Sequence, residues 1–231
     1  MNFFEKMFFP WDVCCVYCKD ENVYKYGFCR SCFDSLSDSE GERCRICLDR
    51  INTRGLCAAC LKEAPDYERL FAPKTYSGIY KDLLHAFKFN NARYLKHPLA
   101  LLMRDALPKE IIDEISVIVP VASSKKRIKD YGYNQAMLLA KELSHLINKP
   151  VRDILEKSSG GSNMYQLNKE ERRKNIRGLY SASGTLSGET VLLVDDICTT
   201  GETLRAISRI LKKAGAGKIY ALTAARDDIK F

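Results

Sequence analysis

Two adjacent aspartates interrupt a buried-looking apolar run in the segment VLLVDDICTTGET, residues 191–203. Carboxylates accept hydrogen bonds from vicinal hydroxyl groups, and a helix start preceded by threonine and glycine lets the backbone wrap around an anion. A ribose 5-phosphate satisfies both halves, with its hydroxyls on Asp195 and Asp196 and its phosphate in the turn from Thr199 to Thr203. An aspartate-capped helix start is the simpler alternative, but a cap needs only one short polar residue.

The cysteines indicate a second kind of chemistry, the binding of metal. Nine of the ten cysteines fall within residues 14–60, and eight of them form four Cys-x-x-Cys pairs. Two such pairs supply the four thiolates of a tetrahedral zinc site, and a site closed by four thiolates is structural rather than catalytic. The expected ligands of two zinc ions are Cys15, Cys18, Cys29, Cys32, Cys44, Cys47, Cys57 and Cys60.

The spacing of the four pairs favours ligands taken in sequence order. Ten residues separate the first two pairs and nine separate the last two, each about the length of a short hairpin. Sequential pairing gives two stacked zinc ribbons, whereas a cross-braced arrangement joins the first pair with the third and the second with the fourth. The doublet Cys14–Cys15 leaves the first ligand open, although only Cys15 has Cys18 at the usual spacing.

From about residue 66 the hydrophobic pattern alternates between strands and helices. Helices are expected at 78–89, 93–107 and 134–148 and from about Gly201, and strands near 69–75, 115–121, 151–155, 190–194 and 218–224. This alternation predicts an α/β fold with a mostly parallel sheet flanked by helices at residues 65–231, behind a cysteine-rich module at residues 1–64. Ligands of such sheets bind beyond the carboxyl ends of the strands, where Asp195 and Asp196 are expected.

Charge and hydropathy exclude several classes of protein. The formal net charge of +8 comes from the second part, since residues 1–64 carry −1 and residues 65–231 carry +9. A basic face of this kind suits phosphates. We expect a cytoplasmic protein without a transmembrane segment, because no apolar run approaches about 18 residues and no secretion signal is recognisable. The absence of a dinucleotide fingerprint and of a P-loop argues against a nicotinamide site and a nucleoside triphosphatase.

The segment VLLVDDICTTGET resembles the phosphoribosyl pyrophosphate (PRPP) loop of type I phosphoribosyltransferases. The order of the chain is more specific: four cysteine pairs, then LLHAFKFNNARYL, YGYNQAMLLAKEL and QLNKEERRKNIRGLY, then the loop. It resembles the competence protein F family, with ComFC and GntX-like members, over essentially the whole length. The resemblance implies a type I phosphoribosyltransferase fold behind a double zinc ribbon, and binding of PRPP together with Mg²⁺.

The resemblance also assigns roles to individual residues. Asp195 and Asp196 would bind the ribose hydroxyls and form the catalytic pair, and the 5-phosphate would lie on Thr199, Thr200, Gly201, Glu202 and Thr203. Pyrophosphate and Mg²⁺ would approach the loop at 121–124, with Lys88, Lys125, Lys126 and Arg127 as phosphate partners. The segment 158–178, with Gln166, Arg172 and Asn175, would close over the site. Tyr131 departs from the family, which often has arginine there.

The function implied by the resemblance is a role in natural transformation, where incoming single-stranded DNA is handled alongside a helicase-like ATPase. Two basic clusters fit such a strand: Lys125, Lys126, Arg127 and Lys129, interleaved with Tyr131 and Tyr133, and Lys169, Arg172, Arg173, Lys174 and Arg177. Charge runs are more usually solvated surface. The alternative is a salvage phosphoribosyltransferase acting on a base or nucleotide-related acceptor. No base-reading segment is recognisable, so the acceptor and the occurrence of catalysis are left open.

Overall fold

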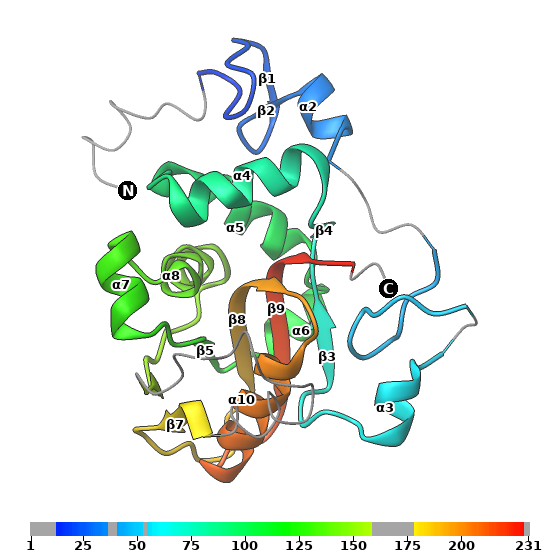
Figure 1. Cartoon of the computed structure of the whole chain (residues 1–231), viewed down its shortest axis with the longest axis vertical. Helices are drawn as coiled ribbons and strands as arrows, with labels where there is room; N and C mark the ends of the chain where they lie inside the picture. The colour runs from blue at the N-terminus through cyan, green and yellow to red at the C-terminus, as the bar shows by residue number, and fades with distance from the viewer. Residues whose placement is uncertain (1–12, 37–40, 53–54, 159–177, 229–231) are drawn as a thin grey trace.

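The computed structural model describes residues 13–36, 41–52, 55–158 and 178–228. Its centre is a parallel sheet in the order β3-β9-β8-β5, with β4 also paired to β9 (Figure 1). These strands are β3 (Arg69–Phe71), β4 (Lys74–Thr75), β5 (Val117–Pro120), β8 (Val191–Cys198) and β9 (Ile219–Arg226). Strands of a parallel sheet are buried on both faces, which explains the continuous apolar runs of β5, β8 and β9.

Helices cover both faces of the sheet. Residues of α4, α5 and α8 share one core with Leu192 and Val194 of β8, and residues of α10 share the other core with Val191 and Leu193. Successive strand residues point to opposite faces, so one strand contributes to both cores. The bounds of these helices are Gly78–Phe89 for α4, Lys96–Asp105 for α5, Gln135–Ile147 for α8 and Glu202–Lys213 for α10.

Smaller elements complete the second part of the chain. A short 3-10 turn, η1 (Arg93–Leu95), leads into α5, and α6 (Lys109–Glu114) precedes β5. The helix α7 (Lys125–Tyr131) follows β5 directly, and β6 (Leu155–Lys157) pairs antiparallel with β7 (Tyr180–Ala182). Among the described residues, no helix is long and apolar enough to cross a membrane.

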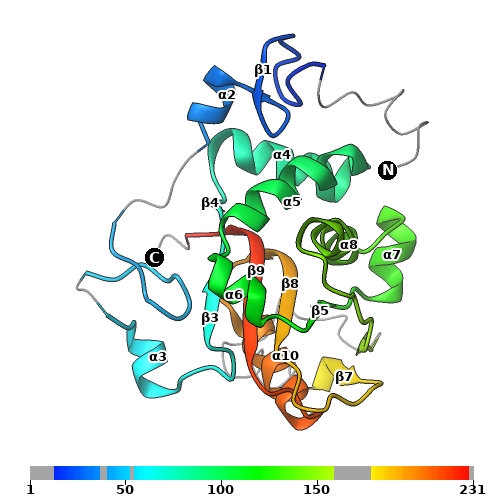
Figure 2. The same cartoon turned by 180° about the vertical axis from the view of Figure 1, so that it is seen from behind.

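The two cysteine groups lie on opposite faces of the sheet. The first, with β1 (Val23–Lys25), β2 (Phe28–Cys29) and α2 (Arg30–Asp34), packs into the core of α4 and α5. The second, with α3 (Ala58–Lys62), packs into the core of α10. Figures 1 and 2 show the first module against α4 and the second beside β3. The expected stacking of two zinc ribbons is therefore wrong, because each group completes a different core.

The same backbone knuckle occurs twice, 29 residues apart. The amide of Cys15 donates to the carbonyl of Asp20 at 2.7 Å, and the amide of Cys44 donates to that of Asp49 at 2.8 Å. Lys19 and Leu48, which follow the knuckles, both have φ near +60°. The two modules therefore share the same backbone turn around and just after their first Cys-x-x-Cys pair. Figure 1 shows that these matching knuckles nevertheless belong to separate modules.

The sequence located most elements, with three differences. The strand expected at 151–155 does not form: Val151 makes an isolated bridge to Ile118, and β6 begins at Leu155 and pairs with β7 rather than with the central sheet. The strand β8 runs on to Cys198, so Asp195 and Asp196 lie inside it rather than beyond its exit. The reason is β9, which remains paired as far as Cys198 and Arg226. The helix α7 was not predicted, because its basic residues carry no apolar stripe: Ile128 is itself 40% exposed.

Candidate functional site

The unequal lengths of neighbouring strands open a crevice at the carboxyl edge of the sheet. The pairing of β5 with β8 ends at Pro120 and Val194, while β9 continues beside β8 for four more residues. Asp195 and Asp196 therefore lie just past the end of β5. Ligands of parallel sheets bind at such edges.

A cleft of about 380 Å³ occupies this edge. It brings together six of the predicted site residues, namely Lys88, Arg127, Asp195, Asp196, Thr199 and Thr203. The other residues that line it are Tyr76, Phe89, Val121, Ala122, Ser123, Asn134, Gln135, Ala136, Lys157, Tyr180, Ile197 and Asp227.

The two aspartates have different surroundings. Asp196 forms an ion pair with Lys88, with Oδ2 and Nζ 3.0 Å apart, and both side chains are largely buried. Burial and then the neighbouring Asp196 carboxylate raise the pKa of Asp195 to about 7, against the opposing influence of Lys88 and Arg127. A carboxyl group that changes charge near neutral pH can exchange a proton or accept hydrogen bonds from hydroxyl groups.

The turn after β8 leads into the N-terminus of α10, which is suited to bind an anion. Gly201 has φ +76°, a left-handed conformation that favours glycine, and α10 begins at Glu202. Thr200 and Glu202 brace this turn, since the amide of Glu202 donates to Thr200 Oγ1 at 3.4 Å. The first amides of a helix have no partner within the helix and lie at the positive end of its dipole. A phosphate bound between Thr199 and Thr203 would accept hydrogen bonds from these amides and lie at the positive end of the dipole.

The segment Gly-Tyr-Asn-Gln fastens α4 to the start of α8. Gly132, with φ +80°, ends α7 in the left-handed conformation. The hydroxyl of Tyr133 donates to the carbonyl of Phe87, and the side-chain Nε2 of Gln135 donates to the carbonyl of Lys88 at 3.2 Å. Asn134 caps α8 and donates to the carbonyl of Val121 at 2.9 Å. The segment thereby fixes the backbone that carries Lys88 toward Asp196.

Additional cleft residues escaped the sequence reasoning. Lys157 and Tyr180 face each other across the β6–β7 pair, with the ammonium 4.8 Å from the ring centroid. Burial, reinforced by Arg127, lowers the pKa of Lys157, and Asp195 and Asp196 oppose that shift. The sequence carries no signal that β6 and β7 pair with each other, or that their pairing brings Lys157 and Tyr180 to the aspartates. The Asn-Gln dipeptide was visible only as a feature of the family.

The predicted basic residues of α7 have different surroundings. Arg127 lines the cleft, Lys125 lines a neighbouring cavity, and Lys126 and Lys129 are exposed. The other predicted cluster, with Arg172, Arg173 and Lys174, and also Gln166 and Asn175, lies outside the described residues.

Both cysteine groups fit zinc. The thiols of Cys15, Cys18, Cys29 and Cys32 lie within 4.8 Å of one another, as do those of Cys44, Cys47, Cys57 and Cys60. Sulfur atoms around a tetrahedral zinc ion, at about 2.3 Å from it, stand about 3.8 Å apart. The sequential grouping accordingly replaces the cross-braced alternative. Zinc held by these thiolates would supply cross-links rather than catalysis, because four sulfur ligands leave no open position.

The two remaining cysteines lie outside these groups. Cys14 is half-buried and belongs to neither set, so Cys15 is the first ligand. Cys198 is buried at the end of β8, where burial raises the pKa of its thiol to about 11. A thiol with a raised pKa is a poor nucleophile, which agrees with a packing role.

Comparison with known proteins identifies relatives along most of the chain. The phosphoribosyl transferase domain family matches residues 128–230. Competence protein F of Haemophilus influenzae is 28% identical, over 92% of this chain and 96% of its own. The DNA utilization protein YhgH of Escherichia coli is 24% identical, over 84% of this chain and 88% of its own.

Among solved structures, orotate phosphoribosyltransferase from Aeropyrum pernix is 13% identical, with a TM-score of 0.38 over 60% of this chain and 75% of its own. The fold assignment rests instead on the matched domain family and on the parallel sheet with its flanking helices. With the cysteine groups ahead of that domain and relatives that span nearly the whole sequence, the predicted resemblance is confirmed: the chain is similar to competence protein F along nearly its whole length, and its second part has a type I phosphoribosyltransferase fold.

Proposed function

We propose that the cleft binds PRPP together with Mg²⁺. The observation that carries this proposal is the pair of aspartates beside a helix start, with Asp196 held by Lys88 at 3.0 Å. The ribose hydroxyls would lie on Asp195 and Asp196, and the 5-phosphate in the turn from Thr199 to Thr203. Arg127 and Lys157 would face the pyrophosphate from the opposite wall.

The cation would enter with its ligand. Mg²⁺ prefers oxygen ligands and is usually bound by one or two carboxylates together with substrate phosphates. The carboxylates of Asp195 and Asp227 line the cleft and fit this preference. When bound, Mg²⁺ neutralises charge on the pyrophosphate leaving group. The chain's own cations, Arg127 and Lys157, would orient that group and offset its remaining charge.

Calorimetric titration of PRPP and Mg²⁺ into the zinc-loaded protein tests this proposal. Saturable binding is expected in the wild type and in Asp153→Asn, a matched variant at an exposed aspartate. Asp195→Asn combined with Asp196→Asn should reduce the affinity at least tenfold. Equal affinity in all three proteins would contradict the proposed site. Pyrophosphate release, assayed in the same samples with added bases or DNA, tests whether transfer occurs and to which acceptor.

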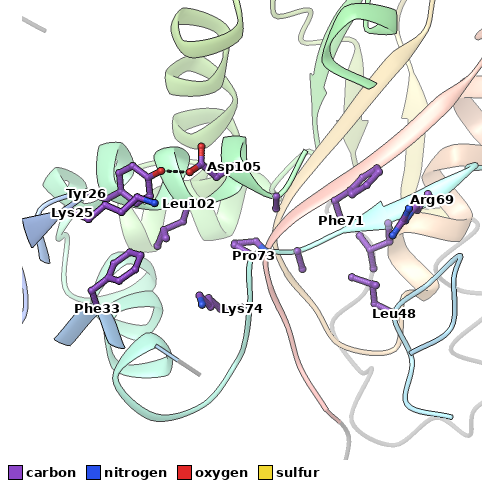
Figure 3. Close-up of a pocket in the computed structure, with 13 residues that line it drawn as sticks. Lys25, Tyr26, Phe33, Leu48, Arg69, Phe71, Pro73, Lys74, Leu102 and Asp105 are labelled. Atoms are coloured by element: carbon purple, nitrogen blue, oxygen red, sulfur yellow. Dashed lines mark hydrogen bonds between the residues drawn. The ribbon is translucent and has the colours of Figure 1, made fainter. Parts of the chain in front are cut away.

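A second candidate function, handling of single-stranded DNA, is favoured by a groove between the two cysteine modules. Figure 3 shows Lys25, Tyr26 and Phe33 on one side of it, and Arg69 and Phe71 on the other. Its volume is about 360 Å³. Cations interleaved with aromatic rings bind the phosphates and bases of a single strand without reading its sequence. The names of the relatives, competence protein and DNA utilization protein, support the same proposal.

Charges in the groove also favour an anionic occupant. The carboxylate of Asp105 is held by the hydroxyl of Tyr26 and by Arg104, whose Nη1 lies 2.7 Å away. Lys25 stands 4.7 Å from the ring centroid of Tyr26, and Arg69 stands 5.0 Å from that of Phe71. The basic charge next to these rings is thus only partly balanced within the groove.

Fluorescence anisotropy with a labelled oligothymidylate would separate this groove from the predicted cluster on α7. Lys25→Gln with Arg69→Gln should weaken binding about tenfold and reduce the log-log salt slope by about 1.4, because each neutralised phosphate contributes about 0.7. The matched pair Lys126→Gln with Lys129→Gln should leave both quantities unchanged. The opposite result would place the strand on α7. A helicase-like ATPase stays a predicted partner of this activity.

A further inference from the structure

A single arginine connects the turn expected to bind phosphate with the second cysteine group. Arg205 lies in the first turn of α10, where its amide donates to the carbonyl of Gly201 at 3.0 Å. Its Nη2 lies 3.1 Å from Sγ of Cys60, and its Nη1 donates to the carbonyl of Glu63 at 2.8 Å. One side chain therefore bridges a zinc-ligand candidate and the helix start beside the cleft.

Further contacts make this link specific to the second group. Tyr67 is buried, and its hydroxyl has no hydrogen-bond partner in the part of the chain that the structure describes. A Cβ added to Gly201 would lie 4.0 Å from that hydroxyl oxygen and 3.8 Å from Sγ of Cys198. The segment between Cys60 and Tyr67 thus packs directly behind the turn. The first cysteine group belongs to the core on the other face of the sheet.

The chemistry of the bridge favours a charged sulfur. Four thiolates around Zn²⁺ carry a net charge of −2, and a guanidinium that donates to one of them offsets part of that charge. Partners of metal ligands of this kind orient the ligands and strengthen metal binding. Bound zinc would hold the Cys60 thiolate in place, and this thiolate would in turn hold the guanidinium of Arg205. Because Arg205 lies in the first turn of α10, the position of that turn would then depend on the zinc.

We propose that Arg205 is a positioning residue that couples zinc in the second cysteine group to anion binding at the turn from Thr199 to Thr203. This inference rests on the proposed PRPP site. Coupling between two ligands is reciprocal, so bound PRPP must strengthen zinc binding by the same factor by which zinc strengthens PRPP binding. Of the two zinc ions, the one at Cys60 is the one affected.

Zinc transfer to a colorimetric chelator tests the coupling in the full-length protein. PRPP with Mg²⁺, at a saturating concentration fixed by calorimetry, should strengthen the binding of one of the two zinc ions, measured by equilibrium competition with the chelator, by about fivefold or more, the lower end of typical couplings. Arg205→Gln should reduce this strengthening below twofold, and Arg205→Lys should restore part of it. Arg209→Gln is the matched control, because Arg209 docks α10 on Glu63 and Asp66 and, among the described residues, donates to no cysteine sulfur.

Hydrogen exchange supplies a readout that needs no ligand. With zinc bound, Arg205→Gln should speed amide exchange in residues 199–207 about tenfold, while residues 191–194 of β8 stay protected and Arg209→Gln behaves like the wild type. Equal strengthening of the binding of both zinc ions, a strengthening retained in Arg205→Gln, or unchanged exchange in residues 199–207 would each overturn the proposal. A wild type that binds no PRPP by calorimetry contradicts the proposed function instead, and the exchange result then decides the positioning role alone.

Discussion

Lys88, at the end of α4, and Asp196, in β8, form an ion pair between two elements that are far apart in the sequence and adjacent in the folded chain. Their side chains are 14% and 12% exposed. Asp195, the next residue along the chain, makes no ion pair within the described residues and keeps a carboxyl group with a raised pKa. Two identical side chains in sequence therefore have opposite electrostatic environments, and their substitutions should differ.

Replacing each aspartate alone should separate these environments. Asp196→Asn leaves Lys88 buried without its partner and should lower the free energy of unfolding by about 1–3 kcal/mol. Asp195→Asn removes a carboxylate whose charge is disfavoured by burial, so it should be neutral or stabilising at pH 8. Urea unfolding of both variants at pH 8 measures the difference. An equal loss of stability would contradict the assigned ion pair.

Stability should also depend on pH through Asp195. Its pKa rises from 3.8 to about 7 on folding. The folded state consequently holds this proton more tightly, and the contribution to the free energy of unfolding falls as the pH rises between these values. The advantage of Asp195→Asn over the wild type should therefore grow from pH 5 to pH 8, with a slope below about 1.4 kcal/mol per pH unit. Urea unfolding at each pH measures it, and a constant difference would refute the raised pKa.

The two asparagines that flank α8 offer a matched test of the clamp on Lys88. Asn134→Ala removes the cap and the bond to Val121, and should cost about 1 kcal/mol of stability and about tenfold in PRPP affinity. Asn148 ends the same helix in the left-handed conformation, with φ +52°, away from the cleft. Asn148→Ala should cost about 1 kcal/mol through backbone strain, with affinity unchanged. Thermal unfolding and calorimetry distinguish the two, and wild-type affinity in Asn134→Ala would reduce the clamp to a purely structural role.

Much of this molecule is readable from sequence because its signals are local. The strand that carries Asp195, the glycine before α10 and the knuckles at Cys15 and Cys44 each depend on neighbouring residues, and their chemistry follows from type and spacing. The partners of the site are distant. Lys157 reaches the cleft through a two-stranded ribbon, and the placement of the two cysteine groups depends on which core each completes. No local hydrophobic periodicity predicts either the position of Lys157 or the placement of the cysteine groups.

Removal of zinc should unfold more than the cysteine-rich segment. Cys44, Cys47, Cys57 and Cys60 share a core with Val119, Leu193 and Ile207, so loss of their metal removes part of the support of the sheet. Protein purified without chelator should contain two zinc ions per chain by atomic emission. Chelation should then bring down the helix and strand signals of circular dichroism in one transition. Two separated transitions would indicate that residues 1–64 fold as an independent unit, as the predicted domain boundary implies.

The pairing of β3 with β9 has a consequence for how the chain matures during synthesis. Leu70 lies opposite Ala221, and the second cysteine group packs in the same core as both residues. Both knuckles leave the ribosome long before β9, so they can bind metal early, but neither reaches its final packing until β9 has emerged. A nascent chain that stops before residue 219 would expose the apolar faces of β3 and β8 together, and such faces are the ones that chaperones bind.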